Sequence, residues 1–500
     1  MKTVNIIGAG IAGLSAGCYL QMNGYETRIF ELHNLPGGLC TGWKRGEYTF
    51  DGCVHWLVGT NPQKQFYSMW NELIDMSKVE VVDHEAYATL KTKDGQSLTL
   101  YTDVDRLEKE LLEKAPEDEK FIRSMVKSIK KLSKLKMNPE KAPEVMGAWE
   151  GLQMLVNFMP YMTHFRKWNK RTRVIAEQVK NPLLKKAIFN SFDPDMSFVF
   201  MLFTLAWMNN KDAGYPVGGS LLLANEIEKR YKQLGGKLYY HNKIEKILTE
   251  KSGKKDKAVG VVTKDGQVHS SDITISAADG HDTLFRMLDE KYRSEKYEKI
   301  YKEFLPFPSY FQVSLGIGKK LNVESTQLIE LDEPIIFDPE TKFSEISFRT
   351  FDCDPTMAPE GKTALTLMLT GRNHEYWMKL RTEDREQYKA EKSRIAREVI
   401  DALDKHLGDI KDHVEEVDVS TPATVVRYTN NWKGSFEGWI MTPEVGFRQL
   451  KKTLPKLDDF YMIGQWVEPG GGLPTALRSG RNVAQLICKN DKRKFRTEHF

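Results

Sequence analysis

A glycine-rich turn near the amino terminus carries the clearest chemical signal in the sequence. Three glycines, Gly8, Gly10 and Gly13, follow a short apolar strand and open a helical stretch. Gly8 permits a tight turn, Gly10 leaves room for a pyrophosphate against the backbone, and Gly13 lets the helix pack on the strand. Glu31 ends the next apolar strand, where it can accept hydrogen bonds from a ribose. This order predicts a βαβ unit that binds a dinucleotide.

A second glycine-rich stretch lies near the carboxyl terminus. Residues 470–472 are glycines, Pro474 follows, and a helical pattern runs to about Ile487. Proline is well tolerated in the first turn of a helix, because its missing N–H would have no partner there. The exposed N–H groups of such a helix start can stabilise negative charge. A loop that only closes the sheet is the alternative.

Composition limits the class of protein. The chain has 500 residues, 28% of them charged, a net charge of +4 and five cysteines, with a mean hydropathy of −0.48. We expect a water-soluble, cytoplasmic protein, because no leader precedes the first strand and the cysteines form no paired pattern. The small charge argues against nucleic-acid binding. No histidine or cysteine spacing suggests a metal, since His374 lacks a partner histidine.

The pattern of apolar residues divides the chain into two interleaved domains. The three ranges 1–75, 214–295 and 455–500 are expected to form one nucleotide-binding domain. The two ranges between them, 76–213 and 296–454, are expected to form a second domain. No internal repeat is visible.

The second domain is expected to combine a helical insertion with a mixed sheet. Helical periodicity dominates from about Asp105 to Asn210. Strands are predicted at 310–317, 345–351 and 363–370, together with one long helix at 382–407.

These motifs resemble those of the flavin-dependent superfamily that contains phytoene desaturases, carotenoid isomerases, retinol saturases and amine oxidases. The chain is most similar to the bacterial branch that resembles phytoene desaturases and carotenoid isomerases. The residues that carry the resemblance are 8–13, Glu31, 36–38, 48–51, 464–474 and Gly480. The resemblance implies an α/β fold: a discontinuous, Rossmann-like FAD-binding domain of the glutathione-reductase type, with an inserted α+β substrate domain.

The resemblance also implies a set of FAD-binding residues and a non-covalent flavin. Many relatives have an arginine after the second glycine pair, where this chain has Leu39, so Lys44 or Arg45 becomes the candidate for that charge. The implied set is Gly8, Gly10, Ile11, Ala12, Gly13, Glu31, Gly37, Gly38, Lys44, Ile244, Ala277, Gly464, Gly471, Gly472, Leu473, Pro474 and Thr475.

Three residues are candidates for catalysis. His55 and Trp56 follow the stretch that comes near the flavin in the family, and His55 could donate a proton or polarise the ring. Trp466 follows Gly464 and could form a wall of the substrate cavity. The alternatives are a histidine bonded within a packed turn and tryptophans in the core.

The implied function is an FAD-dependent oxidoreductase that acts on carbon–carbon bonds of a lipophilic polyene, such as a carotenoid, a retinoid or a fatty acyl chain. Desaturation, saturation and isomerisation all stay open, as do the electron acceptor and the oligomeric state. A flavin amine oxidase is one alternative. A non-catalytic chaperone of the same fold that binds prenyl groups or lipids is the other.

The helical insertion suggests a peripheral membrane contact. Residues 121–134 have one basic face, and the stretches 152–165 and 198–203 are apolar, aromatic and rich in methionine. They could rest on an anionic membrane and open an apolar path to the flavin. Ordinary helical core with a solvated cationic face is the alternative.

Overall fold

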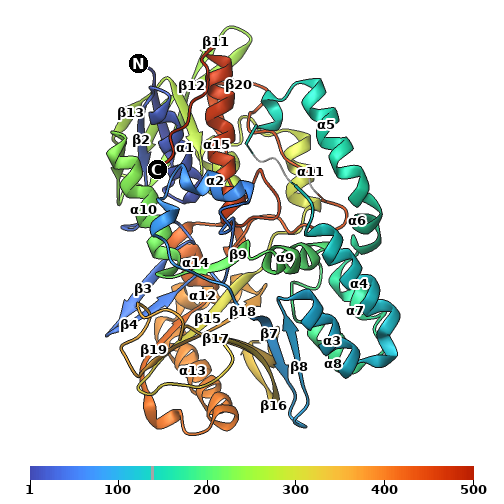
Figure 1. The fold of residues 1–500 in the computed structure, drawn as a ribbon. Coiled ribbons are helices and arrows are strands. Elements are labelled where there is room, and N and C mark those ends of the chain that lie inside the picture. Colours follow the sequence, from blue (N-terminus) through green and yellow to red (C-terminus); the bar gives the residue numbers. More distant parts are fainter. Residues whose placement is uncertain (137–139, 447) are drawn as a thin grey trace.

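A computed structural model describes residues 1–136, 140–446 and 448–500 of the protein. Two β-sheets lie at opposite ends of the molecule, and a layer of helices lies beside them (Figure 1). Both chain termini lie at the end that holds the parallel sheet.

The first sheet is five-stranded and parallel, in the order β10-β2-β1-β14-β21. Its central strand β1 is buried from Val4 to Ile7, as expected for a parallel strand covered on both faces. All five strands come from the ranges 1–75, 214–295 and 455–500. The strands are β1 (Thr3–Ile7), β2 (Glu26–Phe30), β10 (Lys237–Tyr239), β14 (Ile273–Ser276) and β21 (Phe460–Met462).

Three helices pack against this sheet: α1 (Ile11–Met22), α10 (Gly219–Gln233) and α15 (Leu473–Asn490). Two of them, α1 and α15, touch at backbone distance, because a Cβ at Gly480 would lie 2.5 Å from the carbonyl oxygen of Ala12. The contact brings the two glycine-rich motifs, far apart in the sequence, to one place in the fold.

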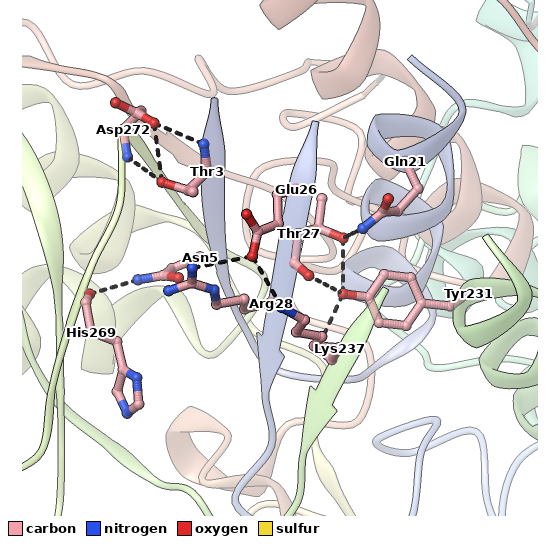
Figure 2. A network of polar contacts seen from close by, with 10 residues as sticks. All are labelled: Thr3, Asn5, Gln21, Glu26, Thr27, Arg28, Tyr231, Lys237, His269 and Asp272. Atoms are coloured by element: carbon pink, nitrogen blue, oxygen red, sulfur yellow. Dashed lines mark hydrogen bonds and ion pairs between the residues drawn. The ribbon is translucent and has the colours of Figure 1, made fainter. Parts of the chain in front are cut away.

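Polar contacts join the segments 1–75 and 214–295 at the sheet (Figure 2). The hydroxyl of Tyr231 on α10 lies 3.0 Å from the carbonyl oxygen of Thr27 and 3.1 Å from that of Lys237. The Asp272 carboxylate, next to β14, accepts from the Thr3 N–H at 2.8 Å and the Thr3 hydroxyl at 3.0 Å. These contacts tie β2 and β10 to α10, and they tie β1 to the start of β14.

Smaller sheets surround the parallel one. Strands β11, β12 and β13 are antiparallel, and β20 adds to β12 in parallel. A hairpin of β3 and β4 projects from the body, and β9 pairs with β5 and β6. The bounds are β3 (Gly42–Arg45), β4 (Tyr48–Asp51), β5 (Leu57–Val58), β6 (Val81–Val82), β9 (Ala213–Pro216), β11 (Ile244–Ser252), β12 (Lys255–Thr263), β13 (Val268–Ser270) and β20 (Leu457–Asp458).

The second large sheet has seven strands in the order β19-β15-β18-β17-β16-β7-β8. All pairs are antiparallel except β16 with β7. Its strands come from the ranges 76–213 and 296–454. They are β7 (Ala86–Lys91), β8 (Ser97–Tyr101), β15 (Ser309–Ile317), β16 (Thr326–Asp338), β17 (Thr341–Thr350), β18 (Thr363–Gly371) and β19 (Val414–Ser420).

The long helix predicted at 382–407 is two helices, α12 (His374–Glu383) and α13 (Arg385–Leu407). Asp384 breaks them apart. Its backbone is non-helical, its N–H donates to Leu380 at 3.0 Å, and its carboxylate accepts from the Gln387 N–H at 2.9 Å. Asp384 thus ends one helix and caps the next, a role that aspartate favours.

The helical layer spans roughly the range where helical periodicity was predicted. Most of its helices bury an apolar face in a common core, but α5 buries no residue. The helices are α3 (Val104–Lys114), α4 (Glu119–Leu132), α5 (Ala148–Phe158), α6 (Met162–Trp168), α7 (Thr172–Ala176), α8 (Pro182–Phe189) and α9 (Val199–Asn209).

Three further helices complete the fold: α2 (Gln65–Asn71), α11 (Glu295–Glu303) and α14 (Pro422–Thr429). Among the described residues, no helix is both long enough and apolar enough to cross a membrane. All five cysteines are free thiols. In the described part of the chain, no three histidine, cysteine, aspartate or glutamate residues are grouped so that they could hold a metal ion.

Candidate active site

The turn from β1 into α1 forms the floor of a cleft. Gly8 has φ +97°, a conformation that favours glycine, and its N–H donates to Phe30 on β2 at 2.8 Å. The N–H of Gly37 donates to the Ala9 carbonyl at 2.8 Å, which brings the second glycine pair over the turn. Helix α1 begins without a side-chain cap and has no acidic residue in its first turn. Its N–H groups and positive dipole end therefore face the cleft.

Gly10 and Gly13 are glycine for different physical reasons. A Cβ at Gly13 would lie 2.0 Å from the carbonyl oxygen of Gly8, so the protein's own packing excludes a side chain there. At Gly10 the backbone is extended, with φ −66° and ψ 170°, and a Cβ would meet no protein atom within 4 Å except the Gly37 oxygen at 3.9 Å. Neither strain nor packing requires glycine at this position. The space above Gly10 faces the cleft, as the close approach of a pyrophosphate requires.

Glu31 sits on the cleft wall at the end of β2. Its carboxylate accepts from the Ala9 N–H at 2.7 Å and from the His33 N–H at 2.8 Å. Burial raises the pKa of this carboxyl, and the backbone hydrogen bonds oppose that rise. Two N–H donors thus hold the carboxylate beside the glycine turn, where a ribose hydroxyl can donate to its remaining lone pairs.

The second glycine motif gives the cleft another helix start. Gly472 precedes α15 with φ +80°, and the helix begins with Leu473 and Pro474. No side chain caps it, and its first turn carries no acidic residue. The Gly464 N–H donates to the Ser479 hydroxyl at 2.9 Å, which ties the end of the last strand to α15. The structure therefore directs two helix N-termini, α1 and α15, at one cleft.

The cleft encloses about 1250 Å³ that contains no protein atoms, part of it open to solvent. Its wall brings together most of the residues predicted to bind the cofactor. These are Gly8, Gly10, Ile11, Ala12, Glu31, Gly37, Gly38, Ile244, Ala277, Gly464, Gly471, Gly472, Leu473 and Thr475. Two others, Gly13 and Pro474, lie outside the wall. Gly13 allows close packing against Gly8, and Pro474 belongs to the first turn of α15.

The structure corrects the prediction for Lys44. This residue lies on β3, in the hairpin with β4, where it is exposed and outside the cleft wall. Its neighbour Arg45 is paired with Asp418 at 2.7 Å. A strand alternates its side chains between two faces, and the sequence does not show which way this hairpin projects. Among the described wall residues, the cation is Lys243 rather than Lys44.

Several wall residues were not predicted from the sequence. Asp279 follows β14, and Glu437 lies in the loop before the last segment; both face the cleft. Burial raises the pKa of each carboxyl to about 7. Asp279 accepts from the N–H groups of Asp282 at 2.7 Å and Trp432 at 2.8 Å. The place of Asp279 after a strand of the parallel sheet was a usable signal, whereas nothing local marks Glu437.

Glu437 lies beside the second glycine motif. A Cβ at Gly471 would come within 2.6 Å of the Glu437 Cβ, so the absence of a side chain at Gly471 makes this approach possible. A carboxyl whose pKa lies near 7 can exist in either protonation state at neutral pH, which suits proton transfer. The cleft thus contains an acid–base candidate from outside the predicted set.

The three predicted catalytic residues do not come together. Trp466 lines the cleft and packs edge-on against Trp439, with ring centres 5.0 Å apart. His55 and Trp56 instead line a second cavity against the seven-stranded sheet. Burial, aided by the charge of Arg349, holds the pKa of His55 well below its usual range, so this histidine is neutral at physiological pH.

The two cavities are neighbours along the chain. Cys53 lines the cleft and His55 lines the second cavity. Two residues of extended chain span at most about 7 Å, so the walls approach within that distance. The second cavity has a volume of about 880 Å³, part of it open to solvent, and its wall includes apolar residues of β7, β8 and β16. The cofactor cleft therefore adjoins a second cavity whose wall combines apolar and polar side chains.

The residues present fit an FAD. The open space above Gly10 and the uncapped start of α1 match the pyrophosphate, and the Glu31 carboxylate matches the ribose. The uncapped start of α15 matches the electron-rich edge of a flavin. A fold with these features defines a flavin-dependent oxidoreductase.

Comparison with known families agrees with this class. The model of the flavin containing amine oxidoreductase family matches residues 11–488. The chain belongs to this family, and it is a flavin-dependent oxidoreductase.

Relatives by sequence include enzymes of carotenoid metabolism. A phytoene desaturase (neurosporene-forming) of Rhodobacter capsulatus is 24% identical, over 96% of this chain and 93% of that protein. A prolycopene isomerase of Daucus carota is 22% identical, over 97% of this chain and 79% of the relative. A 4,4'-diapophytoene desaturase of Methylomonas is 22% identical, over 99% of this chain and 97% of that protein.

Solved structures share the fold. An oxidoreductase from Methanosarcina mazei superposes with a TM-score of 0.62 at 14% identity, covering 97% of this chain and 100% of its own. Putrescine oxidase bound to putrescine gives 0.61 at 11% identity, covering 98% and 99%. These values confirm the predicted α/β, Rossmann-like fold class.

Proposed function

We propose that the protein is an FAD-dependent oxidoreductase that changes carbon–carbon bonds of a lipophilic polyene, by desaturation, saturation or isomerisation. The observation that carries this proposal is the second cavity, whose apolar floor of leucine side chains adjoins the cofactor cleft within about 7 Å. The names of the relatives by sequence, which include desaturases and isomerases of polyenes, support it. When bound, the flavin would supply hydride exchange, and the chain would supply orientation and electrostatics.

The chain's own residues would act in three ways. Gly10 and Glu31 hold the nucleotide half of the cofactor, and the start of α15 stabilises negative charge at its redox half. Glu437 holds or releases a proton beside Gly471, and its raised pKa keeps both states accessible near neutral pH. The apolar side chains of the second cavity exclude water from the substrate.

We further propose that the flavin is held without a covalent bond. None of the wall residues that the carboxyl-terminal motif supplies carries a thiol or an imidazole: they are Gly464, Gln465, Trp466, Gly471, Gly472, Leu473, Thr475 and Ala476. Acid precipitation of the purified protein is expected to leave the yellow flavin in the supernatant, whereas a covalent flavin would precipitate with the chain.

The test of the reaction is anaerobic reduction of the flavin. The purified protein is mixed with a polyene in liposomes, in separate samples as the hydrocarbon and as the free acid, and the flavin absorbance and the extracted lipids are followed together. A desaturase bleaches the flavin and adds a double bond, whereas an isomerase changes only the geometry of the product. Bleaching by putrescine but not by the polyene would favour the amine oxidase alternative. A folded protein that is colourless and does not take up added FAD would favour the chaperone.

Helix α5 supports a peripheral membrane contact. Trp149 is 69% exposed, Met154 is 61% exposed, and Met159, just after the helix, is 62% exposed. Leu155 is 58% exposed and Leu152 is 49% exposed. Monomeric soluble proteins seldom expose so many large apolar side chains together. The helix lies at the outer edge of the helical layer (Figure 1).

The basic face predicted on α4 is only partly available to lipid. Arg123 pairs with Glu119 at 2.8 Å, and Lys130 pairs with Asp105 at 2.6 Å. Lys127 and Lys134 are exposed, and within the described ranges no ion pair involves either of them. We propose that α5 inserts its apolar side chains into an anionic membrane, while the remaining lysines approach the headgroups.

Liposome flotation tests the membrane contact. Vesicles that contain an anionic phospholipid are expected to carry the protein to the top of a density gradient, and a triple variant with Trp149, Leu155 and Met159 changed to Ser is expected to stay at the bottom. Ile336→Ser, at a 56% exposed position on β16, is the matched control and should float like the wild type. Flotation of the triple variant would contradict the proposal.

A further inference from the structure

The second cavity contains a buried cation without a counter-ion. Arg349 on β17 is 8% exposed and lines the cavity. Within residues 1–136, 140–446 and 448–500, no carboxylate oxygen lies within 4.0 Å of its guanidinium. One of its terminal N–H groups donates to the His55 carbonyl at 2.8 Å, and its Nε is buried without a partner. Buried charges are ordinarily paired, so this arginine calls for an explanation.

The surroundings of Arg349 do not neutralise it. Burial lowers the pKa of its guanidinium only to about 10, so it stays charged at neutral pH. Tyr87, Tyr215, Cys353 and Asp51 are the groups that oppose this lowering. Three of them are neutral near pH 7, since burial raises the pKa of each above its usual value. Asp51 already accepts from the N–H groups of Cys53, Val54 and Ser220.

Strand register places hydroxyl groups on both sides of the guanidinium. Arg349 pairs with Thr326 on β16 and with Thr366 on β18. Residues directly opposite each other in antiparallel strands present their side chains on the same face. All three line the cavity. The result is a row of one cation between two hydrogen-bond donors, which is a site for an oxyanion.

The floor of the cavity becomes apolar away from this row. Ser347 pairs with Leu328, and Leu328 pairs with Leu90 on β7. Leu100 and Met368 also line the cavity, and Trp56 and Tyr87 add aromatic rings 5.5 Å apart. The cavity is therefore amphipathic, with a single positive charge at one place and an apolar floor beyond it.

The net charge of the cavity wall indicates which kind of anion the site would bind. Arg349 is the one arginine or lysine among the described residues that line the cavity, and His55 beside it is neutral. One positive charge matches one negative charge, which favours a carboxylate over a doubly charged phosphate. A guanidinium also presents its N–H groups in a fork that fits a carboxylate.

We propose that Arg349, flanked by Thr326 and Thr366, binds the terminal carboxylate of the substrate, so that the protein acts on an unsaturated acyl chain ending in a free acid rather than on a hydrocarbon polyene. This inference rests on the proposed function, and it narrows the substrate class. The carboxylate fixes one end of the chain in the second cavity. The apolar part then extends along the floor, with the flavin cleft within reach through the segment from Cys53 to His55.

Binding of a fluorescent polyene acid tests the inference without turnover. The flavin-loaded, full-length protein is titrated with cis-parinaric acid and, separately, with its methyl ester, which keeps the chain and removes the charge. The wild type is expected to bind the acid about 10- to 100-fold more tightly than the ester, because a hydrogen-bonded ion pair is lost with the ester. Arg349→Gln should remove this preference while leaving the affinity for the ester within about twofold.

Two further variants keep the test decisive if Arg349→Gln folds poorly. Arg349→Lys keeps the charge but loses the fork, so a reduced preference for the acid is expected. Thr326→Val removes one hydroxyl and should weaken acid binding about threefold to tenfold, with no effect on the ester. Equal affinity of the wild type for acid and ester, or a preference that survives in all three variants, would overturn the inference.

The outcomes separate this inference from the proposed function. Tight binding of both acid and ester without preference would refute the role of Arg349 and leave a lipophilic substrate in place. Binding of neither probe by a folded, yellow protein would count against the lipophilic substrate itself and against the carboxylate site.

Discussion

The two cavities of this protein are built in opposite ways. The cofactor cleft owes its shape to backbone: glycine turns, exposed N–H groups and two helix starts, supplied by contiguous motifs. The second cavity owes its shape to side chains that come from strands β7, β8, β16, β17 and β18, from α8 and from the segment around His55. A backbone site needs particular residues at fixed spacing, whereas a side-chain site needs a particular tertiary register. The comparison shows why one site is conspicuous in the sequence and the other is not.

The largest expected effect concerns the buried ion pair that joins α15 to the end of α2. Arg481 on α15 makes two hydrogen bonds to Glu72, at 2.8 and 3.0 Å, and both side chains are less than 10% exposed. Arg481→Met leaves the buried Glu72 carboxylate with the Tyr19 hydroxyl as a donor but without the arginine charge, so the free energy of unfolding should fall by about 3–5 kcal/mol. Urea denaturation measures it. The exposed pair of Arg123 and Glu119 on α4 is the control, where Arg123→Met should cost less than about 1 kcal/mol. Equal losses would contradict the account.

Gly13→Ala should be the next most damaging change. Its Cβ would fall 2.0 Å from the Gly8 oxygen, a backbone atom, so the helix must shift away from the strand. Overpacking of this kind costs about 3 kcal/mol or more. Gly10→Ala meets only one oxygen at 3.9 Å and should leave the unfolding free energy of the flavin-free protein within about 0.5 kcal/mol. Thermal unfolding of both apoproteins checks the contrast, and similar melting temperatures would refute it.

A pH-dependent effect of intermediate size is expected at Asp279. Burial raises the pKa of this carboxyl from its ordinary value near 3.9 to about 7. The stability that this group contributes is fully present below about pH 4 and is lost as pH rises to about 7, because the unfolded chain ionises first. From pH 5 to pH 8, the wild type should lose about 2–3 kcal/mol relative to Asp279→Asn. A difference between the two proteins that does not change with pH would contradict the burial argument.

The smallest expected effect is at Leu155, and it comes from comparing two apolar stretches that look alike in the sequence. Leu202 on α9 is fully buried, whereas Leu155 on α5 is 58% exposed. Leu202→Ala should therefore cost about 3 kcal/mol of unfolding free energy. Leu155→Ala should change it by no more than about 0.5 kcal/mol. Urea denaturation tests both, and a large loss at Leu155 would show that α5 packs on the protein and does not offer a membrane surface.

The pair of Leu202 and Leu155 shows which features can be predicted from the sequence and which cannot. The motif residues could be placed because Gly8, Gly10 and Glu31 act through local backbone geometry. The apolar stretches could not be assigned, because burial depends on which helices meet. The stretch at 198–203 was predicted as part of a lipid surface, but it is largely core, whereas most of 152–159 is exposed.

The walls of the two cavities also depend on tertiary contacts that the sequence does not reveal. Arg349 and Thr326 lie 23 positions apart, yet β16 and β17 place them directly opposite each other. No periodicity within either strand marks that pairing. The sequence also did not show that Lys44 lies outside the cleft wall, since the direction of the β3–β4 hairpin is set by its packing. Glu437 enters the cleft only because Gly471, distant in sequence, leaves room for it.

The central claim is that the cleft beside Gly10 holds the pyrophosphate of FAD. The amount of flavin bound by variants of Gly10 tests it most directly, because a side chain at this position would extend into the cleft and meet almost no protein atom. Each protein is purified, its fold is checked by circular dichroism and thermal unfolding, and bound flavin is measured from its visible absorbance after incubation with FAD. The account predicts a full complement in the wild type and loss of flavin in Gly10→Asp, through steric bulk and like charge at the pyrophosphate, with a native fold in both. A Gly10→Asp protein that is folded and still fully loaded with flavin would contradict it.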